Sequence, residues 1–306
     1  MHLGYHYVRT GIAPGPACSP SRLRAHIVAL KADGYEFLAC REVSRRLRLG
    51  LPLPDKHATL SFDDGFADQY YTAFPILKEY GVPATFFYIS CVLDGRTPPV
   101  IGLQILIDAL GIVRLEKEIF PKVLVGTPYL DLLDERRYDA SGRKMGDPQE
   151  LRRVKWMFNH WPSQSFKRDI LDEIFTTYIG EGSEERLCRE RFMSEAHLRE
   201  MHASGMEIGS HTVTHPAMNI LGRAEIESEL KDSRRRIERE LGGTGIVSFA
   251  WPFGGRFRDV TRRLVGTYYE TGWNYDSTLS HMPEAPYADL TDIPRMNENM
   301  FMRDAS

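Results

Sequence analysis

The sequence lacks a long apolar run, an excess of one charge and any clustering of cysteine. Its best apolar stretch, residues 100–110, contains Asp108 and falls short of the roughly 18 residues that a membrane helix needs. With 39 basic and 42 acidic residues, the net charge of -3 offers no electrostatic attraction for a nucleic acid. The four cysteines lie far apart, so we expect reduced thiols rather than disulfides or a zinc knuckle. They are Cys18, Cys40, Cys91 and Cys188.

The first residues also lack a basic leader followed by a long apolar segment. We therefore expect a protein without a signal peptide or transmembrane segment, located in the cytoplasm. A length of 306 residues allows one large α/β domain or two smaller ones. We favour a single domain over residues 1–306 that carries an insertion.

Strand-like and helix-like segments alternate along most of the chain, as is typical of βα units in a parallel sheet or barrel. The expected strands are residues 3–8, 35–38, 58–62, 84–89, 206–210, 247–251 and 273–276. The expected helices are residues 21–32, 70–80, 223–241 and 260–267. Between about residues 96 and 192 strand signals fade and helical stretches dominate, which predicts a helical insertion.

Two adjacent carboxylates, Asp63 and Asp64, follow the expected strand 58–62. Like charges this close destabilise each other unless a cation holds the site. Far downstream, His211 and His215 follow another expected strand. Because the carboxyl ends of parallel strands meet at one edge, we expect these side chains to converge. One carboxylate and two imidazoles form a typical metal triad, which leaves the second carboxylate as a base.

Each half of this pattern has a simpler interpretation. A histidine pair four residues apart is weak evidence alone, because His2 and His6 share that spacing. Placed on one strand, those two would lie about 13 Å apart, too far to share an ion. One aspartate of the pair could cap the next helix, although capping does not explain two. A third segment, residues 249–255, reads Phe-Ala-Trp-Pro-Phe-Gly-Gly and by itself predicts only a stiff loop.

Taken in order, four segments resemble the polysaccharide deacetylase family, the NodB-homology group known as carbohydrate esterase family 4. They are Tyr-His-Tyr-Val at 5–8, Ser-Phe-Asp-Asp-Gly at 61–65, His-Thr-Val-Thr-His at 211–215 and Trp-Pro-Phe-Gly at 251–254. The resemblance covers about residues 3–95 and 193–300. It implies an α/β fold, a distorted (β/α) barrel of seven or eight strands. It also implies a divalent metal ion, commonly zinc, with cobalt, nickel or iron as alternatives.

By position, the resemblance implies that Asp64, His211 and His215 are the metal ligands and that Asp63 is the general base. A metal ion with three protein ligands keeps open positions, acidifies water and polarises an amide carbonyl. A neighbouring carboxylate can accept the proton of the attacking water. These residue types therefore suit hydrolysis of an amide.

Three further residues are implied to contact the substrate: His6, Trp251 and Phe253. The backbone N–H of Phe253 would stabilise the oxyanion, and the two aromatic side chains would line the acyl pocket. For Trp251 a place in the core is an equally good interpretation.

The sequence departs from the family pattern at two places. The third motif usually carries an arginine two residues before the proline, where this chain has Ala250. Arg295, in the segment Asp-Ile-Pro-Arg, is our candidate for its role of orienting the base. The late histidine that protonates the leaving amine has a candidate in His281, which could equally be a loop histidine.

The expected function is a metal-dependent hydrolase that removes an acetyl or formyl group from an amino sugar of a glycan or glycan precursor. Its partner would be a carbohydrate, free or linked to a nucleotide or lipid, and the insertion would form a lid or recognition element. One alternative is a hydrolase of a non-sugar amide or ureide. Another is a degenerate barrel that only binds glycan, which the missing motif arginine favours and the complete triad opposes.

Overall fold

The structure is a computed structural model of the chain. It describes residues 1–11, 17–134, 149–159, 161, 163–255, 257–275, 287 and 289–301. The chain forms two compact units, one made of residues 1–94 and 188–306 and the other of residues 95–187. The candidate site lies in the first unit.

The first unit is built on a closed barrel of parallel strands. Seven strands follow one another in the order β1-β10-β9-β8-β7-β6-β5, and β5 returns to pair with β1. An eighth strand, β4, pairs with the first two residues of β5, while β6 pairs with its last two. The strands are β1 (His2–Tyr5), β4 (Glu36–Phe37), β5 (His57–Phe62), β6 (Thr85–Tyr88), β7 (Glu207–Ser210), β8 (Ser248–Ala250), β9 (Thr271–Tyr275) and β10 (Ile293–Asn297). The distorted α/β barrel expected from the resemblance is confirmed.

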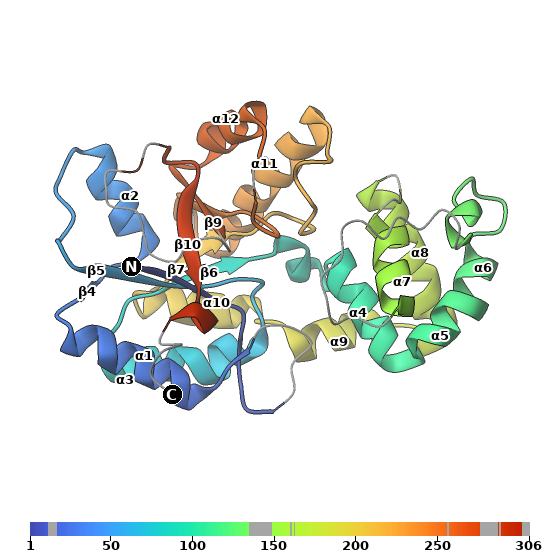
Figure 1. Cartoon of the computed structure of the whole chain (residues 1–306), viewed down its shortest axis with the longest axis horizontal. Coiled ribbons are helices and arrows are strands. Elements are labelled where there is room, and N and C mark those ends of the chain that lie inside the picture. Colours follow the sequence, from blue (N-terminus) through green and yellow to red (C-terminus); the bar gives the residue numbers. More distant parts are fainter. Residues whose placement is uncertain are drawn as a thin grey trace. The chain divides into compact units, whose positions relative to one another are not determined.

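Helices surround these strands (Figure 1). In the first of them Ser19 caps the amino end, its Oγ accepting the Arg22 N–H at 3.2 Å, and Leu23, Ile27 and Leu30 form the buried stripe. The helices of this unit are α1 (Pro20–Ala32), α2 (Cys40–Arg48), α3 (Phe74–Tyr80), α9 (Ser183–Arg191, shared between the units), α10 (Glu195–Ala203), α11 (Arg223–Glu240) and α12 (Asp259–Tyr268). Two short strands, β2 (Tyr7–Val8) and β3 (Ala17–Cys18), pair separately.

The structure departs from the predicted elements in two instructive places. Strand β10 was not predicted, because Pro294 lies at its second position and proline argues against a strand interior. The helix expected over residues 70–80 is interrupted, since Gln69–Ala73 is a π-helical turn that precedes α3. Both departures occur in segments that lie next to the candidate site in the sequence.

The described residues of the second unit form helices and turns without a strand. Its core packs leucine, isoleucine and aromatic side chains, among them Leu106, Phe120 and Leu171. The helices are α4 (Pro99–Leu110), α5 (Ile112–Arg114), α6 (Phe120–Val123), α7 (Gln149–Asn159) and α8 (Gln164–Ile174). Among the described residues of the whole chain, no helix combines the length and the apolar character that crossing a bilayer requires.

Candidate metal centre

Three side chains from two strand ends converge at the carboxyl edge of the barrel. Asp64 follows β5, and His211 and His215 follow β7. The Nε2 atoms of the two histidines each lie 3.6 Å from Oδ1 of Asp64, and one ligand atom from each residue lies within 4.8 Å of the others. The sequence predicted this convergence of the three residues, and their spacing fits a single cation.

Hydrogen bonding and burial prepare these three groups for a cation. Nδ1 of His211 donates to the carbonyl oxygen of Ala250 at 2.9 Å, which leaves the Nε2 lone pair facing Asp64. Burial lowers the pKa of His211 to about 4, so the ring is neutral near pH 7. Burial and then the charge of Asp63 raise the pKa of Asp64 to about 8, and none of the described residues donates a hydrogen bond to its Oδ1. A buried carboxylate beside two neutral imidazoles is a donor set that suits a divalent metal ion.

The second aspartate lies in a different environment. Both carboxylate oxygens of Asp63 accept hydrogen bonds from Arg295, at 2.7 Å each, and one nitrogen of the same guanidinium also donates to Ser61 Oγ at 2.9 Å. Burial is the largest influence and would raise the pKa of Asp63, but the charge and hydrogen bonds of Arg295, together with His211 and His6, outweigh it, so the pKa lies below its usual value. Asp63 is therefore an ionised carboxylate beside the triad.

Aromatic rings fix the position of Arg295. Its guanidinium carbon lies 4.5 Å from the ring centre of Tyr275 and 5.1 Å from that of Phe87. The imidazole of His6 stacks on the ring of Tyr275, with the centres 5.3 Å apart. His6 therefore lies beside the ring that supports the arginine, and its contact with substrate stays a prediction. The planar guanidinium between two rings explains why this buried cation is arginine.

Backbone strain gathers at the same edge of the barrel. In the part of the chain that the structure describes, four residues other than glycine adopt a left-handed backbone, with φ between 55° and 76°. Such a backbone costs on the order of 1–3 kcal/mol per residue and persists where the surroundings enforce it, often at functional sites. The four residues are Asp64, Thr212, His215 and Phe253. Two of them belong to the triad.

The remaining predicted site residues fall in different places. Phe253 is 61% exposed, and its ring centre lies 4.6 Å from that of His215, so it forms a wall beside the triad. Trp251 is fully buried, stacks on Phe257 and donates from Nε1 to the carbonyl of Thr291. Of the two interpretations left open for Trp251, this burial favours the core and argues against a substrate contact. His281 lies outside the described residues.

Two side chains that hold the loops of this site were not predicted from the sequence. Gln69 is fully buried and donates from Nε2 to the carbonyl oxygens of His6 and Asp63, which joins the ends of β1 and β5. Glu229, on α11, accepts hydrogen bonds from the loop that carries the two histidines. The available signal was the position of Glu229 among the apolar residues of its helix, where a glutamate is unusual.

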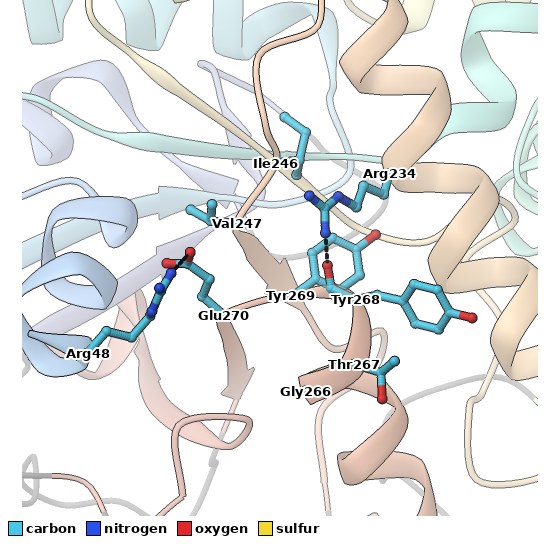
Figure 2. Close-up of a pocket in the computed structure, with 9 residues that line it drawn as sticks. All are labelled: Arg48, Arg234, Ile246, Val247, Gly266, Thr267, Tyr268, Tyr269 and Glu270. Atoms are coloured by element: carbon cyan, nitrogen blue, oxygen red, sulfur yellow. Dashed lines mark hydrogen bonds and ion pairs between the residues drawn. The ribbon is translucent and has the colours of Figure 1, made fainter.

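A hollow of about 390 Å³ lies where β8 and β9 begin, at the edge of the barrel opposite the triad. Figure 2 shows Arg48 directed at Glu270, with which it forms an ion pair, and Arg234 bonded to the carbonyl of Tyr268. Arg234 is also paired with Glu238 at 2.7 Å. Because both arginines have acidic partners, the lining offers no excess charge for an anion.

Comparison with known proteins gives partial sequence matches. The YxkH protein of Bacillus subtilis (strain 168), named as a polysaccharide deacetylase, is 34% identical over 88 residues, which cover 29% of this chain and 31% of that protein. The poly-beta-1,6-N-acetyl-D-glucosamine N-deacetylase of Escherichia coli (strain K12) is 34% identical over 74 residues, 24% of this chain and 11% of that protein. The chain thus matches less than a third of the length of either relative.

Solved structures match along almost the whole chain. The Streptococcus pyogenes deacetylase PplD in complex with acetate has a TM-score of 0.59 at 18% identity, covering 97% of this chain and 90% of that one. IcaB from Ammonifex degensii has a TM-score of 0.57 at 18% identity, with the same coverage. These likenesses show the shared fold. The family model described as polysaccharide deacetylase matches residues 50–101 and 174–271, which include Asp64, His211 and His215. Over these two stretches, about half of its length, the chain is similar to the polysaccharide deacetylase family.

Proposed function

We propose that this protein is a metal-dependent hydrolase that removes an N-acyl group, acetyl or formyl, from an amino sugar of a glycan or glycan precursor. The observation that carries the proposal is the convergence of Asp64, His211 and His215 within 4.8 Å, beside an ionised Asp63. The match to the polysaccharide deacetylase family model and the name of the Escherichia coli relative, an N-deacetylase of a poly-N-acetylglucosamine, support the sugar amide as substrate.

Asp64, His211 and His215 would hold the metal ion. Two imidazoles and one carboxylate suit zinc, and also cobalt, nickel or iron. When bound, the ion supplies Lewis acidity that polarises the amide carbonyl and acidifies water. Two groups are available to bind the ion. They are Oδ1 of Asp64, to which no described residue donates a hydrogen bond, and the Nε2 lone pair of His211.

The other residues of the site transfer protons or position the reacting groups. Asp63 accepts a proton from the water that attacks the acyl carbon, and Arg295 keeps the carboxylate ionised and aimed. As the C–N bond breaks, the leaving nitrogen takes up a proton, for which His281 is the candidate donor. The products are a free amine and the acid. Phe253, exposed beside His215, would wall the acyl group, and its N–H would face the developing oxyanion.

The test is release of acetate or formate by the zinc- or cobalt-loaded chain from N-acyl glucosamine monomers and oligomers. We expect release by the wild type and a loss of at least about 100-fold for Asp63→Asn, because an amide cannot accept the proton. Glu207→Gln is the matched control, since that buried carboxyl lies at the far end of β7 and should leave the rate unchanged. Release from small non-sugar amides alone, or from none of these compounds, would contradict the proposal.

A further inference from the structure

The segment between β7 and α11 that carries both histidines, residues 211–215, is held in an unfavourable backbone conformation. Thr212 and His215 have φ of 69° and 55°. Within this ligand loop, the hydroxyl of Thr212 accepts the N–H of His215 at 2.9 Å. The same hydroxyl donates to the carbonyl oxygen of His211. Two hydrogen bonds of one side chain do not maintain two left-handed residues, so the surroundings must enforce the loop.

Glu229 of α11 holds the loop on one side. Its Oε2 accepts the backbone N–H groups of Val213 at 2.7 Å and Thr214 at 3.0 Å, and its Oε1 accepts the Thr214 hydroxyl at 2.5 Å. The side chain is only 7% exposed. Hydrogen bonds to a buried carboxylate are short and strong, and they replace the water that these amides would otherwise bind.

The other side of the loop is held by backbone alone. The carbonyl oxygens of Thr212 and Val213 accept the N–H groups of Ser90 and Cys91 at 3.1 and 3.0 Å. Helix α11 is itself tied to the end of β7, because Ser233 and Ser210 share a hydrogen bond of 2.8 Å. The loop is therefore held on one side by the Glu229 carboxylate and on the other by the backbone of Ser90 and Cys91. We call these contacts the clamp.

We propose that Glu229 is a positioning residue that sets the affinity of the site for its metal ion. The inference rests on the proposed function, which assigns the two histidines as ligands. Val213 and Thr214 lie between those ligands in sequence, so releasing their amides moves both imidazoles. Loss of an outer partner of this kind lowers metal affinity by about 10–100-fold. Glu229 acts through the loop backbone and contacts neither histidine side chain in the hydrogen bonds described.

The experiment compares zinc and cobalt affinity, measured by chelator competition, in wild type, Glu229→Met and Glu229→Gln. Methionine keeps the volume and the helix but removes the acceptor of two partly buried N–H groups, so we expect affinity to fall about 10–100-fold. Glutamine retains an oxygen that both amides can use, so we expect affinity within a few-fold of wild type. The visible spectrum of bound cobalt should change in Glu229→Met, which reports ligand geometry rather than stability.

Glu207→Met is the matched control for loss of a buried carboxylate. Glu207 also accepts a backbone N–H and a hydroxyl, from Arg41 and Thr85, but at the opposite end of β7. We expect this variant to unfold at a lower temperature and to keep its metal affinity. If Glu229→Met does not fold, Thr214→Val removes a single bond of the clamp and should still weaken metal binding and alter the cobalt spectrum.

The outcomes separate the two claims. Suppose that the wild type binds metal and that Glu229→Met leaves the affinity and the cobalt spectrum unchanged. This result would overturn the role of Glu229 and leave the proposed function intact. If Glu229→Met does not fold, the same result in Thr214→Val would have the same meaning. Equal losses of affinity in Glu207→Met and Glu229→Met would also overturn it, because the effect would then be general destabilisation. A wild type that binds no metal would overturn the proposed function, and this inference with it.

Discussion

Asp63 and Asp64 are neighbours in sequence but lie in opposite electrostatic environments. Asp63 is paired through both oxygens with Arg295, and its pKa is lowered against the effect of burial. Asp64 is buried without that partner, and its pKa is raised to about 8. This separation agrees with the proposed roles, an ionised base for Asp63 and a metal ligand for Asp64. A change at Arg295 should therefore affect the base and spare the ligands.

Replacing Arg295 with lysine tests this separation. Lysine keeps the charge but loses the planar fork and the contacts with the Tyr275 and Phe87 rings. We expect kcat for deacylation to fall about 100-fold, with KM and metal content close to wild type. Arg262→Lys, which alters an exposed ion pair on α12, is the control. A kcat equal to that of wild type would show that Arg295 does not orient the base.

At the scale of elements, the strands of the barrel fit together through a few close approaches. In β1, a Cβ added to Gly4 would lie 2.3 Å from Oη of Tyr275, which belongs to β9 and packs on Arg295. Gly4 therefore leaves room for the ring that supports the arginine. The requirement is steric, since the glycine sits within a regular strand.

Substituting Gly4 by alanine should force Tyr275 to move. We expect a loss of about 1–3 kcal/mol in the free energy of unfolding, as is typical of overpacking, together with reduced deacylation. Gly245→Ala is the matched control, because no atom lies within 4 Å of its added Cβ. Chemical denaturation of both variants provides the measurement. Equal stability of the two would contradict the close approach.

Helix α1 contributes a pH-sensitive contact to the barrel. His26 is buried, with Nδ1 2.9 Å from Tyr5 Oη and Nε2 accepting from Arg22. Burial, and then the charge of Arg22, lower the pKa of His26 to about 4. In the unfolded chain its pKa is near 6.5, so the unfolded state binds the proton first and stability falls as pH drops below 6.5.

Between neutral pH and pH 5, protonation of His26 in the unfolded chain lowers the free energy of unfolding by about 2 kcal/mol. In His26→Gln that part of the pH dependence should vanish. Urea denaturation of both proteins at pH 7.5 and pH 5 provides the measurement. The same loss of stability on acidification in the variant would show that His26 is not responsible.

The sequence predicted most strands and helices because their apolar periodicity is local. Adjacent carboxylates and a histidine pair at strand ends predicted that these side chains converge, and the family resemblance implied Asp64 rather than Asp63 as the ligand. Strand β10 was not predicted because Pro294 lies within it. This strand places Arg295 next to Asp63, which is 232 residues away in the sequence. Glu229 was missed because two of its three hydrogen bonds come from backbone N–H groups, so that only its position among the apolar residues of α11 could have marked it. Contacts made through the backbone thus escaped prediction, whereas the contact of Arg295 with Asp63 was expected only as a substitute for the family's motif arginine.

At the scale of the whole molecule, the residues proposed for catalysis and the residues of the helical unit are separate. The triad, Asp63 and Arg295 all belong to residues 1–94 and 188–306. The family model also matches on both sides of residues 102–173 and skips that stretch. We propose that the helical segment is an insertion that selects the substrate rather than a part of the metal site.

Excising residues 95–187 tests this division. A short Gly-Ser linker should suffice, because Sγ of Cys188 lies 3.9 Å from the carbonyl oxygen of Val92. We expect the shortened protein to fold and to bind metal with wild-type affinity, since every proposed ligand remains. Activity on long or carrier-linked glycans should fall more than activity on a small N-acyl amino sugar. Equal loss on both substrates would contradict a role in selection.

The central claim is that one aspartate binds metal and its neighbour does not, and elemental analysis of three purified proteins tests it most directly. We predict about one zinc or cobalt ion per chain in the loaded wild type and in Asp63→Asn, and almost none in Asp64→Asn, because only Asp64 belongs to the triad. Metal retained in Asp64→Asn, or lost equally from both variants, would contradict the assignment of the site.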